Sequence, residues 1–88
     1  MNVQFRASFA KDLKKISNKD ILNNVRETID QIGRAPGPQD ISGLTKLKGA
    51  RNYYRVRVGE YRIGLILEGD TVVFVRCLDR KEIYRYFP

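Results

Sequence analysis

Arginines recur at short intervals in residues 52–67, whose sequence is NYYRVRVGEYRIGLIL. Arg55, Arg57 and Arg62 belong to this segment, and Arg80 follows it. A guanidinium group stays protonated and can hold a phosphate through two parallel hydrogen bonds. If the fold brings these arginines together, they can bind a phosphate or stabilise the charge that develops when a phosphodiester is cleaved. The simple alternative is that they are solvated surface charges.

Cleavage of RNA by its own ribose 2′-hydroxyl also needs a proton acceptor and a proton donor. The sequence has no histidine, and arginine is not a realistic base. Tyr84 and Tyr86 lie close to Arg80 in the sequence and are candidate proton donors, whereas aromatic packing of the C-terminal residues is the alternative for either one. The aspartates have no spacing typical of a metal site, so we expect a metal-independent site without a cofactor.

Further cationic and aromatic residues flank this set. They are candidates for additional contacts with RNA: Arg51, Tyr53, Lys81 and Arg85.

The arginine-rich segment alternates like two strands joined at Gly59 and Glu60, where a leading glycine suits a two-residue type II′ turn. In this register Arg57 lies opposite Arg62. Like charges in that position destabilise a sheet by some tenths of a kcal/mol up to about 1 kcal/mol. A bound phosphate would turn this repulsion into attraction, which favours a functional site.

The remaining elements define an α+β fold of the order β-α-α-β-β-β in one domain, residues 1–88. We expect two N-terminal helices on one face of a small, mostly antiparallel twisted sheet, a possible short C-terminal helix, and an opposite face that stays available. The expected elements are a strand over residues 2–6, a helix capped by Ser8, a second helix from a capping box at residues 17–20 to Gly33, an exposed connection over residues 34–43, the hairpin, and a buried strand TVVFVRCL.

The charge of the chain points to an anionic partner. Lysine and arginine number 17 against 10 acidic residues, a net charge of +7, so RNA, DNA or an acidic protein are the expected partners. No stretch is long and apolar enough for a membrane span, and the N-terminus lacks the pattern of a secretory signal. The single Cys77 reads as a core residue in a reducing, cytoplasmic setting.

The segment LTKLKGARNYYRVRVGEYRIGLIL, followed by VVFVRCLDRKEIYRYF, resembles a known family. It is similar to the Leu-x-Gly, Tyr-Arg-x-Arg-x-Gly-x-Tyr-Arg and terminal Arg-x-x-x-Tyr pattern of the RelE/ParE superfamily of small bacterial toxins, most closely its RelE-like mRNA interferase branch. The resemblance covers essentially the whole chain in the same element order.

The resemblance implies the toxin of a type II toxin–antitoxin system, an endoribonuclease that enters the ribosomal A site, cuts mRNA and is held inactive by a cognate antitoxin. Arg55 and Arg57 match basic residues of the family strand, Arg62 matches the arginine after the turn, and Arg80 matches the arginine after the last strand. Tyr84 or Tyr86 matches the terminal tyrosine, according to the spacing used.

Two departures from the family pattern leave the proton acceptor open. Relatives often have lysine where this chain has Arg55 and Arg57, and histidine where it has Asp79. The acceptor can then be Asp79, Glu82, a tyrosinate or a group of the ribosomal RNA.

Two other functions fit the same residues. The first is a ParE-like inhibitor of DNA gyrase, which shares the fold and cuts no RNA. The second is a noncatalytic RNA-binding module, which also needs cations and aromatic rings on one sheet face.

Overall fold

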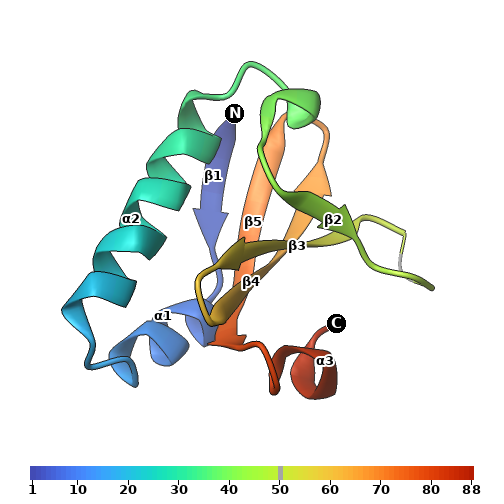
Figure 1. Ribbon diagram of the computed structural model, residues 1–88. Coiled ribbons are helices and arrows are strands. Elements are labelled where there is room, and N and C mark those ends of the chain that lie inside the picture. The colour runs from blue at the N-terminus through green and yellow to red at the C-terminus, as the bar shows by residue number, and fades with distance from the viewer. Residues whose placement is uncertain (50) are drawn as a thin grey trace.

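The computed structural model describes residues 1–49 and 51–88, which form a five-stranded sheet with helices on both faces (Figure 1). The strand order is β1-β5-β4-β3-β2; β1 runs parallel to β5 and every other neighbouring pair is antiparallel. The expected α+β class is confirmed. In chain order the elements are β1 (Asn2–Phe5), α1 (Ala7–Lys14), α2 (Lys19–Arg34), the 3-10 helix η1 (Pro38–Asp40), β2 (Leu44–Lys46), β3 (Tyr53–Val58), β4 (Tyr61–Glu68), β5 (Thr71–Asp79) and α3 (Ile83–Tyr86).

The β3–β4 hairpin has the register that the sequence predicts. Arg57 lies opposite Arg62, and Arg55 lies opposite Gly64. Gly59 has a φ of +58°, and among the described residues only glycines have a positive φ. A type I′ turn would need a positive φ at Glu60 as well, so the backbone agrees with a type II′ turn.

The edge strand β2 was not predicted. It has three residues, Leu44–Lys46, which pair with β3. So short a strand shows no usable alternation of apolar and polar residues, and its pairing with β3 is a long-range contact.

The helix starts differ from the sequence expectations. Ser8 does not cap α1: the N-cap is Arg6, without a side-chain cap, and the Ser8 hydroxyl instead donates to the Val75 carbonyl at 2.6 Å. Asn18 caps α2, one residue later than expected, and accepts from the backbone amides of Asp20 and Ile21. A run of several capping-competent residues does not by itself select which one becomes the cap.

The main core lies between α1, α2 and one face of the sheet. Apolar residues at helical spacing on the two helices meet alternate residues of the strands, as the sequence predicts. The buried members are Phe9, Ile16, Val25, Ile32, Val56, Val58, Ile63, Leu65, Val72, Phe74 and Cys77. We call the opposite side of the sheet the outer face.

A bulge in β5 changes which of its residues share a face. Gly64 pairs with Arg76 but Leu65 pairs with Phe74, so Val75 is an extra residue in β5. Phe74 and Cys77 therefore both enter the main core although they are three residues apart. The same shift puts Arg76 on the outer face beside Gly64.

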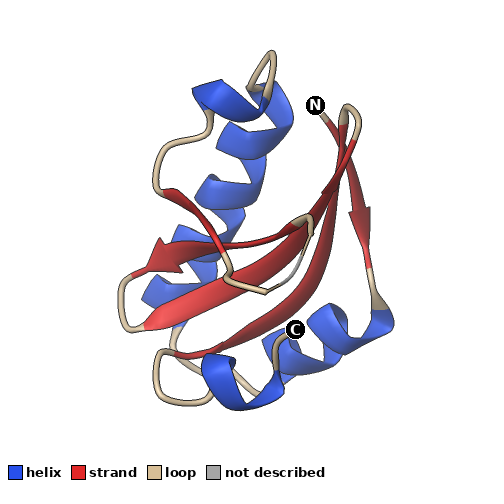
Figure 2. Ribbon diagram, turned by 90° about the vertical axis from the view of Figure 1, so that its right-hand side faces the viewer, coloured by secondary structure: helices blue, strands red, loops and turns tan. Residues whose placement is uncertain are grey.

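Side chains of α1 complete the hydrogen bonding of β5 where its partner β1 ends. The pairing with β1 reaches only Phe74. Beyond it, Ser8 donates to the Val75 carbonyl, and the Asp12 carboxylate accepts from the Cys77 amide at 2.9 Å. Buried backbone groups need such partners, so α1 takes the place of a longer strand here. Figures 1 and 2 show α1 and α3 near the same end of the sheet.

Cys77 lies in the core, as expected, and this makes its reactivity a test of the fold. Burial, with a smaller contribution from the Asp12 charge, raises the pKa of the Cys77 thiol from 9.0 to about 12. We expect no reaction with a disulfide reagent at pH 8 in the native protein, and full reaction after unfolding in urea, because only the thiolate attacks. The thiol's contribution to stability should be complete below pH 9 and disappear as the pH rises towards 12. Rapid labelling of native protein at pH 8 would contradict this placement.

Among the described residues, no helix is long and apolar enough to cross a bilayer.

Candidate active site

The outer face carries two rows of residues that cross the strands. Arg55, Gly64 and Arg76 are successive partners on β3, β4 and β5, and we call them the central row. One row nearer to the β3–β4 turn, Arg57 lies opposite Arg62. The hairpin register therefore places Arg55, Arg57 and Arg62 on one face, as the sequence predicts.

Three arginines gather near the β3–β4 turn, and we call them the turn arginines: Arg57, Arg62 and Arg80. The guanidinium of Arg62 donates to the carbonyls of Gly59 and Tyr61 at 2.8 and 2.9 Å. Arg80, beyond the end of β5, is tied to the turn by its amide, which donates to the Glu60 carbonyl at 2.8 Å. The turn thus joins cations from three segments of the chain.

Glu60 is the counter-ion of this cluster. Its Oε2 lies 3.1 Å from Arg80 Nε, and both side chains are exposed. An exposed pair of this kind is weak and screened by salt, so a phosphate that approaches the cluster can replace the carboxylate.

Arg55 lies on the central row, beneath a tyrosine. Its guanidinium carbon is 5.2 Å from the centre of the Tyr84 ring, within the range of a cation–π contact. Arg76 is placed in the same way, 5.8 Å from the ring of Tyr86. Both tyrosines remain open to solvent, with 62% of Tyr84 and 52% of Tyr86 exposed. The structure therefore brings both candidate tyrosines to the arginine-bearing face.

The expectation that the outer face stays available is wrong at its centre. Ile83 and Phe87 are buried, and the Phe87 ring covers Gly64 and stacks on Tyr53 at 5.3 Å between centroids. A glycine without a side chain leaves room for the ring. The last ten residues are too few to show a clear period, so the sequence did not reveal this packing.

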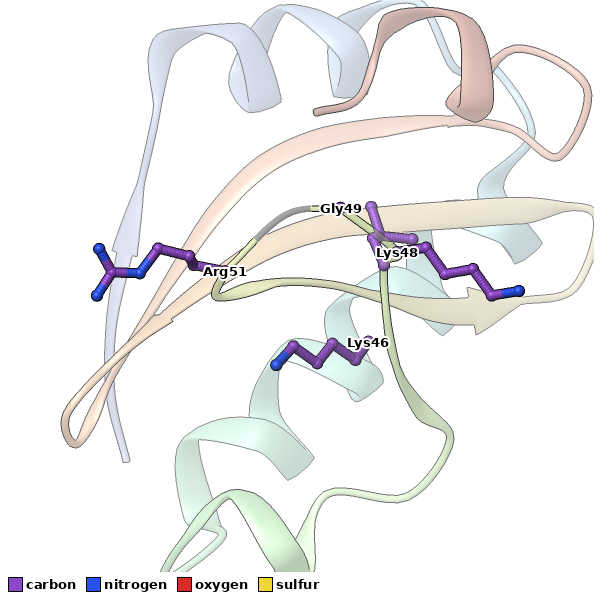
Figure 3. A pocket seen from close by; sticks show the side chains of 5 residues that line it. Lys46, Lys48, Gly49 and Arg51 are labelled. Atoms are coloured by element: carbon purple, nitrogen blue, oxygen red, sulfur yellow. The ribbon is translucent and has the colours of Figure 1, made fainter.

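The predicted flanking contacts fall in different places. Arg51 lies in the β2–β3 loop, where Lys46, Lys48 and Arg51 border an open pocket of about 440 Å³. Figure 3 shows that Lys48 and Arg51 point in opposite directions from this loop. Tyr53 is about 13 Å along β3 from Arg57, at 3.3 Å per residue, whereas Lys81 is exposed before α3 and Arg85 is exposed within it. These residues do not form one cluster.

A second pocket joins the β2–β3 loop to the C-terminal residues. Its volume is about 430 Å³, and it combines cationic and apolar side chains, which suits a nucleotide. The lining residues are Thr45, Lys46, Leu47, Lys48, Arg55, Tyr84, Phe87 and Pro88.

Acidic groups close to the site are few. Asp79 accepts a hydrogen bond from the Lys81 amide at 2.9 Å, and Glu82 begins the turn that becomes α3. Residues 1–49 and 51–88 hold no cluster of three potential metal ligands. The arrangement can bind an anion and supply phenolic protons. Its carboxylates are Glu60, which is paired with Arg80, and Asp79 and Glu82, which lie close to Arg80 in the sequence.

Arg76 and Asp12 were missed by the sequence analysis. Two guanidinium nitrogens of Arg76 donate to the Asp12 carboxylate at 2.7 and 3.1 Å, and this hydrogen bonding raises the pKa of Arg76. An arginine inside the apolar run VVFVRCL is the signal, because a cation in a buried strand needs a carboxylate partner. The partner itself could not be chosen from the sequence.

Comparison with known proteins gives consistent matches. Residues 3–84 match the family described as ParE toxin of type II toxin–antitoxin system, parDE. Toxin RelE3 of Methanocaldococcus jannaschii is 43% identical over an alignment of 89 residues that covers both chains completely. The RelB–RelE antitoxin–toxin complex from Methanococcus jannaschii contains a chain with a TM-score of 0.81 and 40% identity, covering 97% of this chain and 99% of that one. For the toxin–antitoxin complex RelBE2 from Mycobacterium tuberculosis the values are 0.72 and 25%, with 90% of each chain covered.

Proposed function

The chain belongs to the RelE/ParE toxin family of type II toxin–antitoxin systems, and we propose that this toxin acts by cutting mRNA in the ribosomal A site. The observation that carries the proposal is the gathering of Arg57, Arg62 and Arg80 around one turn, with Arg55 and Tyr84 on the next row. An inhibitor that only binds a protein has no chemical need for several phosphate ligands beside a phenol.

In the proposed reaction the turn arginines hold the scissile phosphate. The ribose 2′-oxygen attacks phosphorus, the bond to the 5′-oxygen breaks, and the guanidinium groups stabilise the negative charge that builds up on the phosphate oxygens. Tyr84, or Tyr86 in its place, donates a proton to the departing 5′-oxygen. The products are a 2′,3′-cyclic phosphate and a 5′-hydroxyl end, and no metal takes part.

The acceptor of the 2′-hydroxyl proton is Asp79, Glu82, a tyrosinate or a group of the ribosomal RNA. Asp79 and Glu82 are the nearest carboxylates along the chain to Arg80. Arginine stays protonated at neutral pH and cannot serve. A base supplied by ribosomal RNA would make cleavage depend on the ribosome.

A cognate antitoxin is the second proposed partner. Both solved structures compared above are complexes of a toxin with its antitoxin. With a net charge of +7, this chain attracts an acidic or amphipathic segment of the antitoxin. A segment bound over the turn arginines would prevent RNA from binding there.

Inhibition of DNA gyrase is the competing function, because the matching family is described by the ParE toxin. It predicts that the purified toxin inhibits supercoiling and produces no RNA ends. Both functions arrest growth, so growth alone does not separate them.

The test is to map RNA 5′-ends after induction of the toxin. We expect new 5′-hydroxyl ends inside translated reading frames within minutes, and the same ends when purified toxin is added to programmed ribosomes. Naked mRNA should be cut far more slowly. Growth arrest without new ends, together with inhibited gyrase supercoiling, would overturn the nuclease in favour of the competing function.

A further inference from the structure

We infer that Phe87 is a positioning residue, whose ring, seated over Gly64, sets where Tyr84 lies relative to the arginines. The inference rests on the proposed function, since it takes Tyr84 as the proton donor. It concerns residues 83–88, which we call the C-terminal segment.

The Phe87 ring occupies the space over Gly64 that any other residue at position 64 would fill with its side chain. Phe87 is 4% exposed. A Cβ atom built on Gly64 would lie 2.6 to 2.8 Å from three carbons of the Phe87 ring, well inside van der Waals contact. Any side chain at position 64 must therefore displace the ring.

The C-terminal segment follows the central row with its aromatic residues. Tyr84 lies on Arg55, Phe87 on Gly64 and Tyr86 beside Arg76. Because Tyr84 and Tyr86 lie in the four-residue helix that directly precedes Phe87, a displaced Phe87 moves the two tyrosines off their arginines as well.

The tyrosines cannot anchor the segment themselves. Both are more than half exposed, and α3 has only four residues and no side-chain N-cap. Ile83 and Phe87, the buried residues on either side, supply the apolar attachment. The position of Tyr84 is thus set by neighbours that take no part in proton transfer.

The experiment is a double-mutant cycle of Gly64→Ala and Tyr84→Phe, with cleavage on programmed ribosomes as the readout. Tyr84→Phe alone should lower the rate about 100-fold, as expected for loss of a general acid. Gly64→Ala alone should lower it by a similar factor of about 100, the effect of a displacement of about 1 Å. Once Tyr84 is displaced its hydroxyl matters little, so Tyr84→Phe in the Gly64→Ala background should add less than about threefold.

Two further variants guard against loss of folding. Phe87→Leu leaves position 64 unchanged and should also reduce the effect of Tyr84→Phe. Gly33→Ala is the matched control, because a Cβ there meets only Val3, at 3.9 Å, and both the rate and the Tyr84→Phe effect should be unchanged. Thermal unfolding identifies any variant that fails to fold.

A full 100-fold effect of Tyr84→Phe in folded Gly64→Ala protein would overturn the inference, because it would show that the contact of Phe87 with Gly64 does not position Tyr84. Ring position has its own readout: the NMR shifts of the Gly64 α-protons, displaced by the Phe87 ring in the wild type, should return towards ordinary values in Phe87→Leu. Unchanged shifts would also overturn it. A wild-type toxin that cuts no RNA would instead refute the proposed function, whereas the Gly64 shifts would still report whether the Phe87 ring lies over Gly64.

Discussion

Replacing Arg62 and Arg80 together by alanine is expected to abolish growth arrest and to slow cleavage on programmed ribosomes by at least about 10³-fold. Removal of one preorganised donor from a charge-stabilising site typically costs about 10² to 10³ in rate, and the double variant removes two. The two arginines come from β4 and from the residue after β5, and the turn brings them together.

The same variant should keep its stability within about 1 kcal/mol of the wild type. Loss of Arg62 removes its hydrogen bonds to the Gly59 and Tyr61 carbonyls, but it also relieves the repulsion from Arg57 opposite. Loss of the Arg80 side chain removes an exposed ion pair with Glu60. Activity and stability therefore separate, which a variant that merely unfolds the protein would not show. Urea unfolding followed by circular dichroism measures the second quantity.

The matched control is Arg26→Ala with Arg34→Ala. Both residues are exposed on α2, across the sheet from the turn arginines, and the change in net charge is the same. The control should remain toxic. A fully toxic Arg62→Ala, Arg80→Ala protein would remove the turn arginines from the site.

The largest expected loss of stability is for Arg76→Ala, about 3 to 5 kcal/mol. The Asp12 side chain is 3% exposed, and its carboxylate accepts two hydrogen bonds from Arg76 and one from the Cys77 amide. Without Arg76 a buried carboxylate loses its counter-charge, and such removal is strongly destabilising. A domain of this size has about 5 to 15 kcal/mol in total, so denaturant unfolding should show a much lower midpoint.

Replacing Asp12 by alanine should lower the stability less than Arg76→Ala does. Arg76 is 25% exposed, so after Asp12→Ala its guanidinium can turn to water, and the main loss is the acceptor for the Cys77 amide. Asp12→Asn keeps an acceptor oxygen and should be milder still. The double variant Asp12→Ala, Arg76→Ala should be more stable than Arg76→Ala alone, since no buried charge is stranded. A double variant less stable than both single variants would contradict this account of the pair.

Local patterns in the sequence were sufficient for the hairpin and its charged face. Alternation over residues 52–67 and the leading glycine of the turn determined that Arg57 faces Arg62 and that Arg55 shares their side. These are contacts between residues close in the chain, where strand period and turn chemistry decide the register. The family resemblance rests on the same segment.

Only the tertiary structure decided what surrounds that face. The docking of Phe87 on Gly64, the partnership of Arg76 with Asp12, the bulge at Val75 and the edge strand β2 all join residues from separate segments. No local period encodes such pairs. Each depends on which polar groups still lack a hydrogen-bond partner, and which spaces are still unfilled, once the sheet has formed. The sequence by itself therefore determined that the three hairpin arginines share a face, and the packing added Arg76 to that face and determined which of the cations stay open to a ligand.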